Sequence, residues 1–76
     1  MGQVKKAREV ILRAVEGGSL APEGEPRAVS IEVYADETTE RAIVYCEGEA
    51  ARVYYRAESW PLWVRQWARL CGVLDR

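Results

Sequence analysis

The sequence predicts one α+β domain over residues 1–76, a two-layer α-β-β-β-α fold with both helices on one face of a three-stranded antiparallel sheet. Two patterns predict this fold. Apolar residues recur with helical spacing near both ends of the chain, whereas the middle alternates apolar and polar residues in three consecutive runs. A chain of 76 residues buries only about 60% of the surface that its unfolded form exposes, so its large side chains are needed in the core.

The first predicted element is an amphipathic helix over residues 3–16, which ends at Gly17 because glycine tolerates the left-handed conformation of a helix end. The apolar residues of this helix share one broad face: Val4, Ala7, Val10, Ile11, Ala14 and Val15. Residues 17–28 form a loop, since Gly and Pro interrupt the segment throughout. A loop of this length is either a flexible connector or a binding loop, and both interpretations remain open.

Three strands are predicted next, at 28–36, 40–47 and 50–57. Each run has apolar side chains at every second position, which is the period of a strand with one face in the core. The short connections between the runs predict antiparallel neighbours.

The turn between the last two strands sets which side chains of the third strand face the core. Glycine suits the first central position of a type II′ turn, so a two-residue turn at Gly48 and Glu49 is predicted. This turn sets Val44 opposite Val53, which places Val53 on the core face and Tyr54 on the other face.

The final predicted element is a helix over residues 60–72, with Ser59 as the N-cap. Trp60, Trp63 and Trp67 recur at the spacing of one helical stripe. We expect this stripe to pack against the sheet, because burying a tryptophan removes about 150 to 250 Å² from water, which so small a domain needs.

Cys46 and Cys71 are expected on the facing surfaces of the sheet and the last helix, and therefore near each other. Buried free thiols are favoured over a disulfide, because the protein is expected to be cytoplasmic. Neither cysteine suggests a catalytic thiol, since the chain has no histidine to activate one.

The second face of the predicted sheet is unusually rich in aromatic and arginine residues for a surface exposed to water. The predicted partner-binding residues on this face are Tyr34, Arg41, Ile43, Tyr45, Arg52, Tyr54 and Arg56. Enrichment in tyrosine and arginine is typical of binding surfaces. The alternative is ordinary cross-strand packing on an open sheet, because tyrosine and isoleucine are also good strand formers.

Two kinds of partner fit this face. A protein partner, including a second copy of the chain, needs an apolar patch with a rim of mixed charge, and both are predicted. Single-stranded nucleic acid would stack its bases on the tyrosines and contact the arginines with its phosphates. Glu32 and Glu47 on the same face, together with a net charge of −1, favour the protein partner.

Composition argues against several classes of function. The chain has no histidine and only two cysteines, so histidine-based catalysis and zinc sites with four thiolates are excluded. Its acidic residues are scattered, and it has no glycine-rich phosphate-binding motif. We therefore predict no enzyme activity, no cofactor and no metal, and the apolar run near the N-terminus is too short to predict a membrane span.

The predicted order of a helix, three strands and a helix resembles that of the double-stranded RNA-binding domain over nearly the whole chain. In that family the second helix opens with a lysine-rich segment that contacts phosphates. The corresponding segment here, Ser59–Leu62, has no cation, and the first one follows at Arg65. The resemblance is one of topology and implies no RNA binding by this chain.

Overall fold

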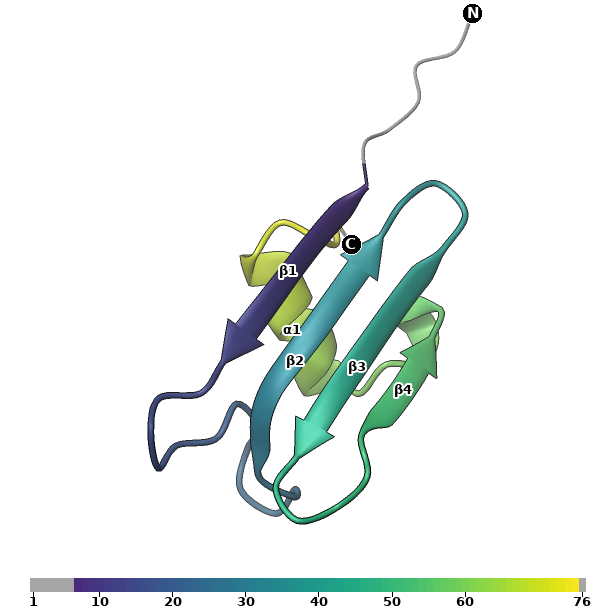
Figure 1. The fold of residues 1–76 in the computed structure, drawn as a ribbon. Helices are drawn as coiled ribbons and strands as arrows, with labels where there is room; N and C mark the ends of the chain where they lie inside the picture. Colours follow the sequence, from purple (N-terminus) through teal and green to yellow (C-terminus); the bar gives the residue numbers. More distant parts are fainter. Residues whose placement is uncertain (1–6, 76) are drawn as a thin grey trace, which may run out of the picture.

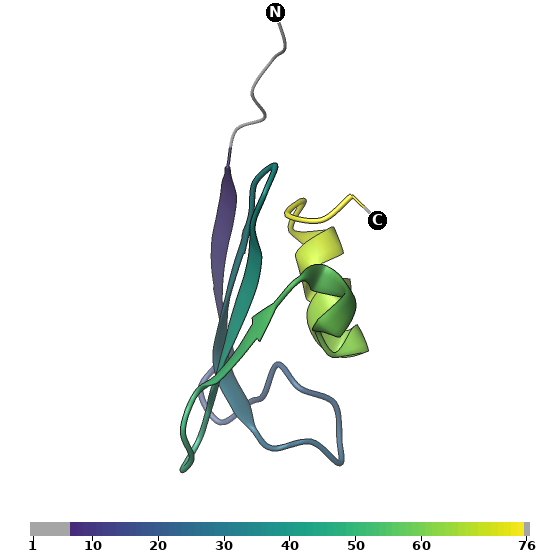
Figure 2. The same ribbon diagram turned by 90° about the vertical axis from the view of Figure 1, so that its right-hand side faces the viewer.

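The computed structural model describes residues 7–75 of the chain. Its elements follow in the order β1 (Arg8–Arg13), β2 (Ala28–Ala35), β3 (Glu40–Cys46), β4 (Arg52–Tyr55), the 3-10 helix η1 (Ala57–Ser59) and α1 (Leu62–Leu70). The strands form one antiparallel sheet in the order β1-β2-β3-β4, as Figure 1 shows. α1 lies across one face of this sheet, and no other helix or strand of residues 7–75 covers the opposite face (Figure 2).

The predicted α-β-β-β-α order is therefore wrong, although the fold is α+β. The described chain has four strands followed by one α-helix, in place of three strands between two helices. The topological resemblance to the double-stranded RNA-binding domain is therefore wrong as well, because it depended on a helix before the first strand, and the described chain begins with β1.

The segment predicted as the first helix forms β1 instead. The predicted helix spanned residues 3–16, of which 3–6 lie outside the described residues. Val10 pairs with Val33 and Leu12 with Ile31 along β2. The short apolar run 10–12 fits either a helical face or a strand, so periodicity could not decide between them. The strand prevails because β-branched residues favour it and because pairing satisfies the backbone groups along the edge of β2.

The central strands β2 and β3 confirm the predicted runs 28–36 and 40–47 to within one residue at each end. One detail differs near the start of β2, where the register shifts between Ala28 and Ser30. Such an irregularity interrupts the alternation of the two faces at that point. Ala28 is consequently buried, while Val29, predicted in the core, keeps 39% of its surface exposed.

β4 lies within the predicted run 50–57, but its register is one residue away from the predicted one. Val44 pairs with Arg52, and Ile43 pairs with Val53. The turn is thus longer than the predicted two residues, and a shift of one residue exchanges the two faces of a strand. Tyr54 packs against the core, whereas Tyr55 on the other face is 65% exposed.

The core lies between the sheet and α1. Its buried apolar residues are Ala28, Ile31, Val33, Ala35, Ala42, Val44, Ala57, Trp60, Val64, Ala68, Val73 and Leu74. The predicted core position of the three tryptophans is confirmed: Trp60 is only 2% exposed, and Trp63 and Trp67 pack partly buried against the same cluster. Leu70, predicted on the same stripe, is instead 79% exposed.

Cys46 and Cys71 are free thiols, and both pack partly buried against the core. No helix of the described residues is long and apolar enough to cross a lipid bilayer.

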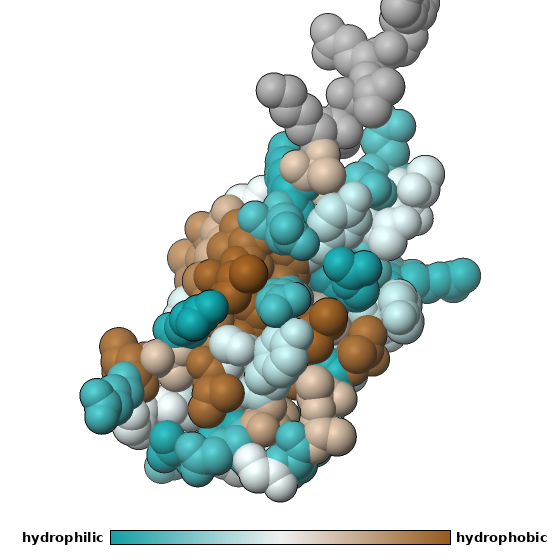
Figure 3. Space-filling model, viewed as in Figure 1, coloured by the Kyte–Doolittle hydropathy of each residue, from teal (hydrophilic) through white to brown (hydrophobic). Residues whose placement is uncertain are grey.

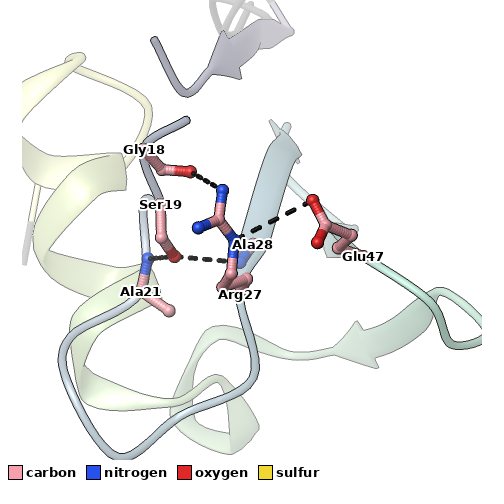
Figure 4. Close-up of polar contacts among 6 residues, drawn as sticks. All are labelled: Gly18, Ser19, Ala21, Arg27, Ala28 and Glu47. Atoms are coloured by element: carbon pink, nitrogen blue, oxygen red, sulfur yellow. Dashed lines mark hydrogen bonds and ion pairs between the residues drawn. The ribbon is translucent and has the colours of Figure 1, made fainter. Parts of the chain in front are cut away.

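The loop between β1 and β2 is held by hydrogen bonds to its own backbone and side chains (Figure 4). Ser19 Oγ accepts hydrogen bonds from the backbone N–H groups of Ala21 at 3.1 Å and Ala28 at 3.0 Å. The guanidinium group of Arg27 donates to the carbonyl oxygen of Gly18 at 3.1 Å. These contacts close the loop at the start of β2.

The same loop also contacts α1. The indole Nε1–H of Trp67 donates to the carbonyl oxygen of Leu20 at 2.9 Å, and the side chain of Leu20 packs against the core. The loop therefore covers one end of the helix layer.

Candidate functional site

The face of the sheet opposite α1, called the open face below, collects the side chains at alternate positions of all four strands. Its residues are Glu9, Ile11, Arg13, Ser30, Glu32, Tyr34, Arg41, Ile43, Tyr45, Val53 and Tyr55. Figure 3 views the molecule from this side and shows hydrophobic patches interrupted by hydrophilic side chains.

The middle of the open face is a row of four residues, one from each strand. Ile11 pairs with Glu32, Glu32 with Ile43, and Ile43 with Val53. Ile11 is 52% exposed and Val53 46% exposed. Three of the four residues in this row are thus apolar residues on a face without a covering layer, and this is the arrangement expected of a surface that another molecule covers.

Glu32 is the one charged residue in that row, and it is engaged by Tyr45. A hydrogen bond to Glu32 raises the pKa of Tyr45 above its usual 10.0, with smaller contributions from desolvation and the carboxylate charge. A shallow hollow of about 380 Å³ lies beside this pair and is bordered by Ile11, Arg13, Ala14, Val29, Ser30, Glu32 and Tyr45. The open face is therefore concave next to β1.

A second row crosses the sheet next to the first and contains Glu9, Tyr34, Arg41 and Tyr55. The guanidinium carbon of Arg41 lies 5.4 Å from the centre of the Tyr34 ring, within the range of a cation–π contact. Arg41 is directly opposite Tyr55 in β4. Two tyrosines therefore flank one arginine, which is a combination common at the centre of protein interfaces.

The hydroxyl group of Tyr34 is already engaged. It donates a hydrogen bond to Asp36 Oδ2 at 2.7 Å. This bond is the main cause that raises the pKa of Tyr34 and lowers the pKa of Asp36. Tyr34 is consequently held by Arg41 over its ring and by Asp36 at its hydroxyl group.

Four of the seven predicted site residues lie together on the open face, namely Tyr34, Arg41, Ile43 and Tyr45. The predicted position of the others on this face is wrong. Arg52 and Tyr54 point to the side of α1, because β4 has the shifted register. Arg56 follows the end of β4 with a φ of 68°, outside the strand.

Arg52 makes its contacts on the helix side of the sheet. It donates a hydrogen bond to Glu49 Oε1 at 3.0 Å. Its pKa is raised mainly by a hydrogen bond with Tyr54 and next by Glu49. Arg52 is therefore not available to a ligand on the open face.

The sequence reading missed three exposed apolar residues of the open face, Ile11, Val53 and Tyr55. No decisive signal existed for Ile11, because the run Val10–Leu12 is apolar throughout and shows no alternation. None existed for Val53 and Tyr55 either, since their face depends on the length of a turn.

Glu47 was predicted on the same face as Glu32, and two carboxylates in one pocket would have suggested acid–base chemistry. Glu47 instead lies beyond the end of β3, where its carboxylate is 3.8 Å from Arg27 (Figure 4). Of these two carboxylates, Glu32 alone borders the hollow of the open face.

Two further hollows lie elsewhere on the described surface. One, of about 620 Å³, is bordered by the β2–β3 hairpin and the start of η1: Asp36, Glu37, Thr38, Thr39, Glu40, Arg56 and Glu58. The other, of about 300 Å³, lies between α1 and the loop before β2, bordered by Leu20, Ala21, Pro22, Trp63, Gln66, Trp67 and Leu70. Within residues 7–75 no group of three or more acidic or cysteine residues is arranged to hold a metal ion.

No family model, curated protein or solved structure matches this chain.

Proposed function

We propose that this protein is a small non-enzymatic interaction module that binds a protein, either another chain or its own copy, through the open face of the sheet. The observation that carries the proposal is the row of Ile11, Ile43 and Val53 on a face that α1 does not cover. A four-stranded sheet with apolar residues on both faces has one more hydrophobic surface than one helix can bury.

The charges of the open face support a protein partner over nucleic acid. Arg13 and Arg41 are balanced by Glu9 and Glu32, two positive against two negative charges, so the face has no net charge. The register of β4 removes Arg52 from the face, and the chain as a whole has a charge of −1. Binding to a phosphate backbone depends on a clear excess of positive charge, which is lacking here.

The proposal is tested by placing a charge on the open face, in the apolar row or in the row next to it, without disturbing the core. Val53→Glu and Tyr55→Glu change residues that are 46% and 65% exposed, so both variants should fold. We expect Val53→Glu to bind a protein partner captured by the wild type with an affinity at least about tenfold lower, because the buried glutamate would be unpaired. Tyr55→Glu places its charge opposite Arg41 and should weaken binding through loss of the tyrosine ring. The measurement is capture from the native host followed by titration of the purified partner.

The matched control is Leu62→Glu, which places the same charge at a residue of α1 that is 56% exposed on the other side of the molecule. Binding should survive this change. Equal loss with Leu62→Glu and Val53→Glu, or no loss with either, would contradict the proposed site. Single-stranded and duplex oligonucleotides titrated at two salt concentrations form a separate arm, and tight binding at low salt would replace the protein partner by nucleic acid.

A further inference from the structure

β1 is an edge strand whose outer side is free of other strands. It pairs with β2 on one side only, and Figure 1 shows no element beside it in the plane of the sheet. An edge strand presents a row of unpaired backbone N–H and C=O groups, which is a template for pairing with another strand.

The residues of β1 that direct their backbone outward follow from its register. The backbone N–H of Ala14 donates to the carbonyl oxygen of Val29 at 2.9 Å, so this pair lies at a hydrogen-bonded position of the antiparallel ladder. These positions alternate along the strand, and the even-numbered residues of β1 therefore bond to β2. Glu9, Ile11 and Arg13 direct their N–H and C=O groups away from β2, and no hydrogen bond to these groups is formed within residues 7–75.

We propose that β1 pairs antiparallel with β1 of a second copy about a two-fold axis at Ile11, so that two sheets join into one continuous eight-stranded sheet. This inference concerns the edge of the sheet and stands whether or not the open face binds a partner.

Charge complementarity selects both the partner and the register. With Ile11 opposite its own copy, Glu9 of each chain lies opposite Arg13 of the other. All three are residues with outward backbone groups, so the side-chain pairing and the hydrogen-bond ladder agree. A shift of two residues in either direction keeps the ladder but sets Glu9 or Arg13 opposite an apolar residue.

Neither charge is taken up by an ion pair in the described chain. Glu9 and Arg13 form no ion pair among residues 7–75, and both side chains are exposed. Their neighbours in β2 are Tyr34 and Ser30, which carry no charge at neutral pH. In the proposed dimer, two ion pairs flank two isoleucines that are 52% exposed in the single chain.

The other edge of the sheet fits this role less well. β4 has only four residues, and the chain turns out of the strand at Arg56, whose φ is 68°. Self-pairing of β4 would bring together few backbone N–H and C=O groups. β1 has six residues, and on the open face it carries Glu9 near one end and Arg13 at the other.

The experiment uses two charge reversals in the full chain. Glu9→Arg gives an edge with two arginines, and Arg13→Glu gives an edge with two glutamates. Each variant alone sets like charges opposite each other twice, so its dimer should dissociate at least about tenfold more readily than that of the wild type. An equal mixture of the two variants restores both pairs, because every arginine then faces a glutamate of the other chain.

Sedimentation or light scattering reports the mass over a range from micromolar to near-millimolar concentration. We expect twice the chain mass of 8.6 kDa for the wild type, a single-chain mass for each variant and a heterodimer for the mixture. A wild type that stays monomeric at the highest concentration would overturn the proposal. So would single variants that remain dimeric, or a mixture that fails to associate.

Amide hydrogen exchange distinguishes the proposed edge from a general effect on folding. The amides of Val10 and Leu12 bond to β2 and should be protected in the wild type and in the monomeric variants. The amides of Glu9, Ile11 and Arg13 should be protected only in the dimer. Val53→Glu lies at the far edge of the sheet and should remain dimeric, which separates failure of this proposal from failure of the open-face proposal.

Discussion

At the scale of single residues, Asp36 is the most heavily hydrogen-bonded side chain near the open face. Its Oδ1 accepts hydrogen bonds from the backbone N–H groups of Thr38 at 2.8 Å and Thr39 at 2.6 Å, while Oδ2 accepts the Tyr34 hydroxyl at 2.7 Å. These bonds favour the ionised carboxylate and lower the pKa of Asp36 below 3.8, the Tyr34 bond most of all. Asp36 thus connects the β2–β3 hairpin to the ring that Arg41 covers.

The lowered pKa predicts how stability changes with pH. A carboxylate with a lower pKa in the folded chain stabilises that chain fully above its unfolded pKa, and the stabilisation disappears as pH falls through the folded pKa. The wild type should therefore exceed Asp36→Asn in stability by a constant amount above about pH 5, and this difference should shrink below pH 3.8. Urea unfolding of both proteins at a series of pH values from above pH 5 to well below pH 3.8 measures the difference.

Tyr34→Phe provides the matched comparison, because it removes only the hydroxyl donor. The pH-dependent difference between Tyr34→Phe and the double variant with Asp36→Asn should be smaller than that between the wild type and Asp36→Asn. If the wild type and Asp36→Asn showed the same dependence of stability on pH, the hydrogen bonds would not perturb the pKa of Asp36.

At the scale of elements, the residue that directly follows β4 has a strained backbone conformation. Arg56 has φ 68° and ψ 124°, a region that residues with a side chain rarely adopt, and it directly precedes η1. Its backbone N–H donates to the carbonyl oxygen of Glu40 at 3.1 Å, which holds the chain in this conformation. Such a conformation costs about 1 to 3 kcal/mol.

Glycine at this position should relieve the strain. Arg56→Gly is expected to raise the free energy of unfolding by about 1 kcal/mol, the relief being partly offset by the greater freedom of glycine in the unfolded chain. Arg56→Ala removes the same charge but keeps a Cβ atom, so it should not stabilise. Urea unfolding distinguishes the two, and equal effects of glycine and alanine would contradict the strain.

The elements also differ in how well the sequence predicted them. β2, β3 and α1 were predicted because apolar and polar residues alternate in the two strands and the tryptophans recur with helical spacing. The bounds of the helix were wrong: α1 spans Leu62–Leu70 in place of 60–72, and Ser59 lies in η1 and is not the N-cap of α1. β1 was not predicted, since a run of three apolar residues fits both periods and only the free edge of β2 decides between them. The open face was therefore predicted in its two central strands and missed at β1.

The face of β4 could not be read from the sequence either. Tyr54 and Tyr55 are adjacent, so each possible register buries one tyrosine and exposes the other. Hydrophobicity does not choose between them, and the length of the turn around Gly48, whose φ is 78°, sets the outcome. Tyr34, Arg41, Ile43 and Tyr45 were placed correctly because no such ambiguity affects β2 and β3.

At the scale of the whole molecule, one helix and one sheet have to supply the entire core. A domain of this length has a net stability of about 4 to 11 kcal/mol, taking roughly 0.05 to 0.15 kcal/mol per residue. Trp60 is the largest fully buried side chain, at 2% exposure, and it lies between η1 and α1, where the chain crosses from the sheet to the helix layer. Truncation of Trp60 would therefore remove the largest fully buried side chain of the core.

Trp60→Ala should consequently come close to unfolding the protein. Truncation of a buried tryptophan costs about 3 to 5 kcal/mol, which is comparable with the whole net stability. Leu70→Ala also removes a large apolar side chain, but Leu70 is 79% exposed, so its effect should stay within about 0.5 kcal/mol. Urea unfolding followed by circular dichroism should show a lost or strongly shifted transition for Trp60→Ala and a near-normal one for Leu70→Ala. Similar midpoints for the two variants would mean that the layers are held together elsewhere than at Trp60.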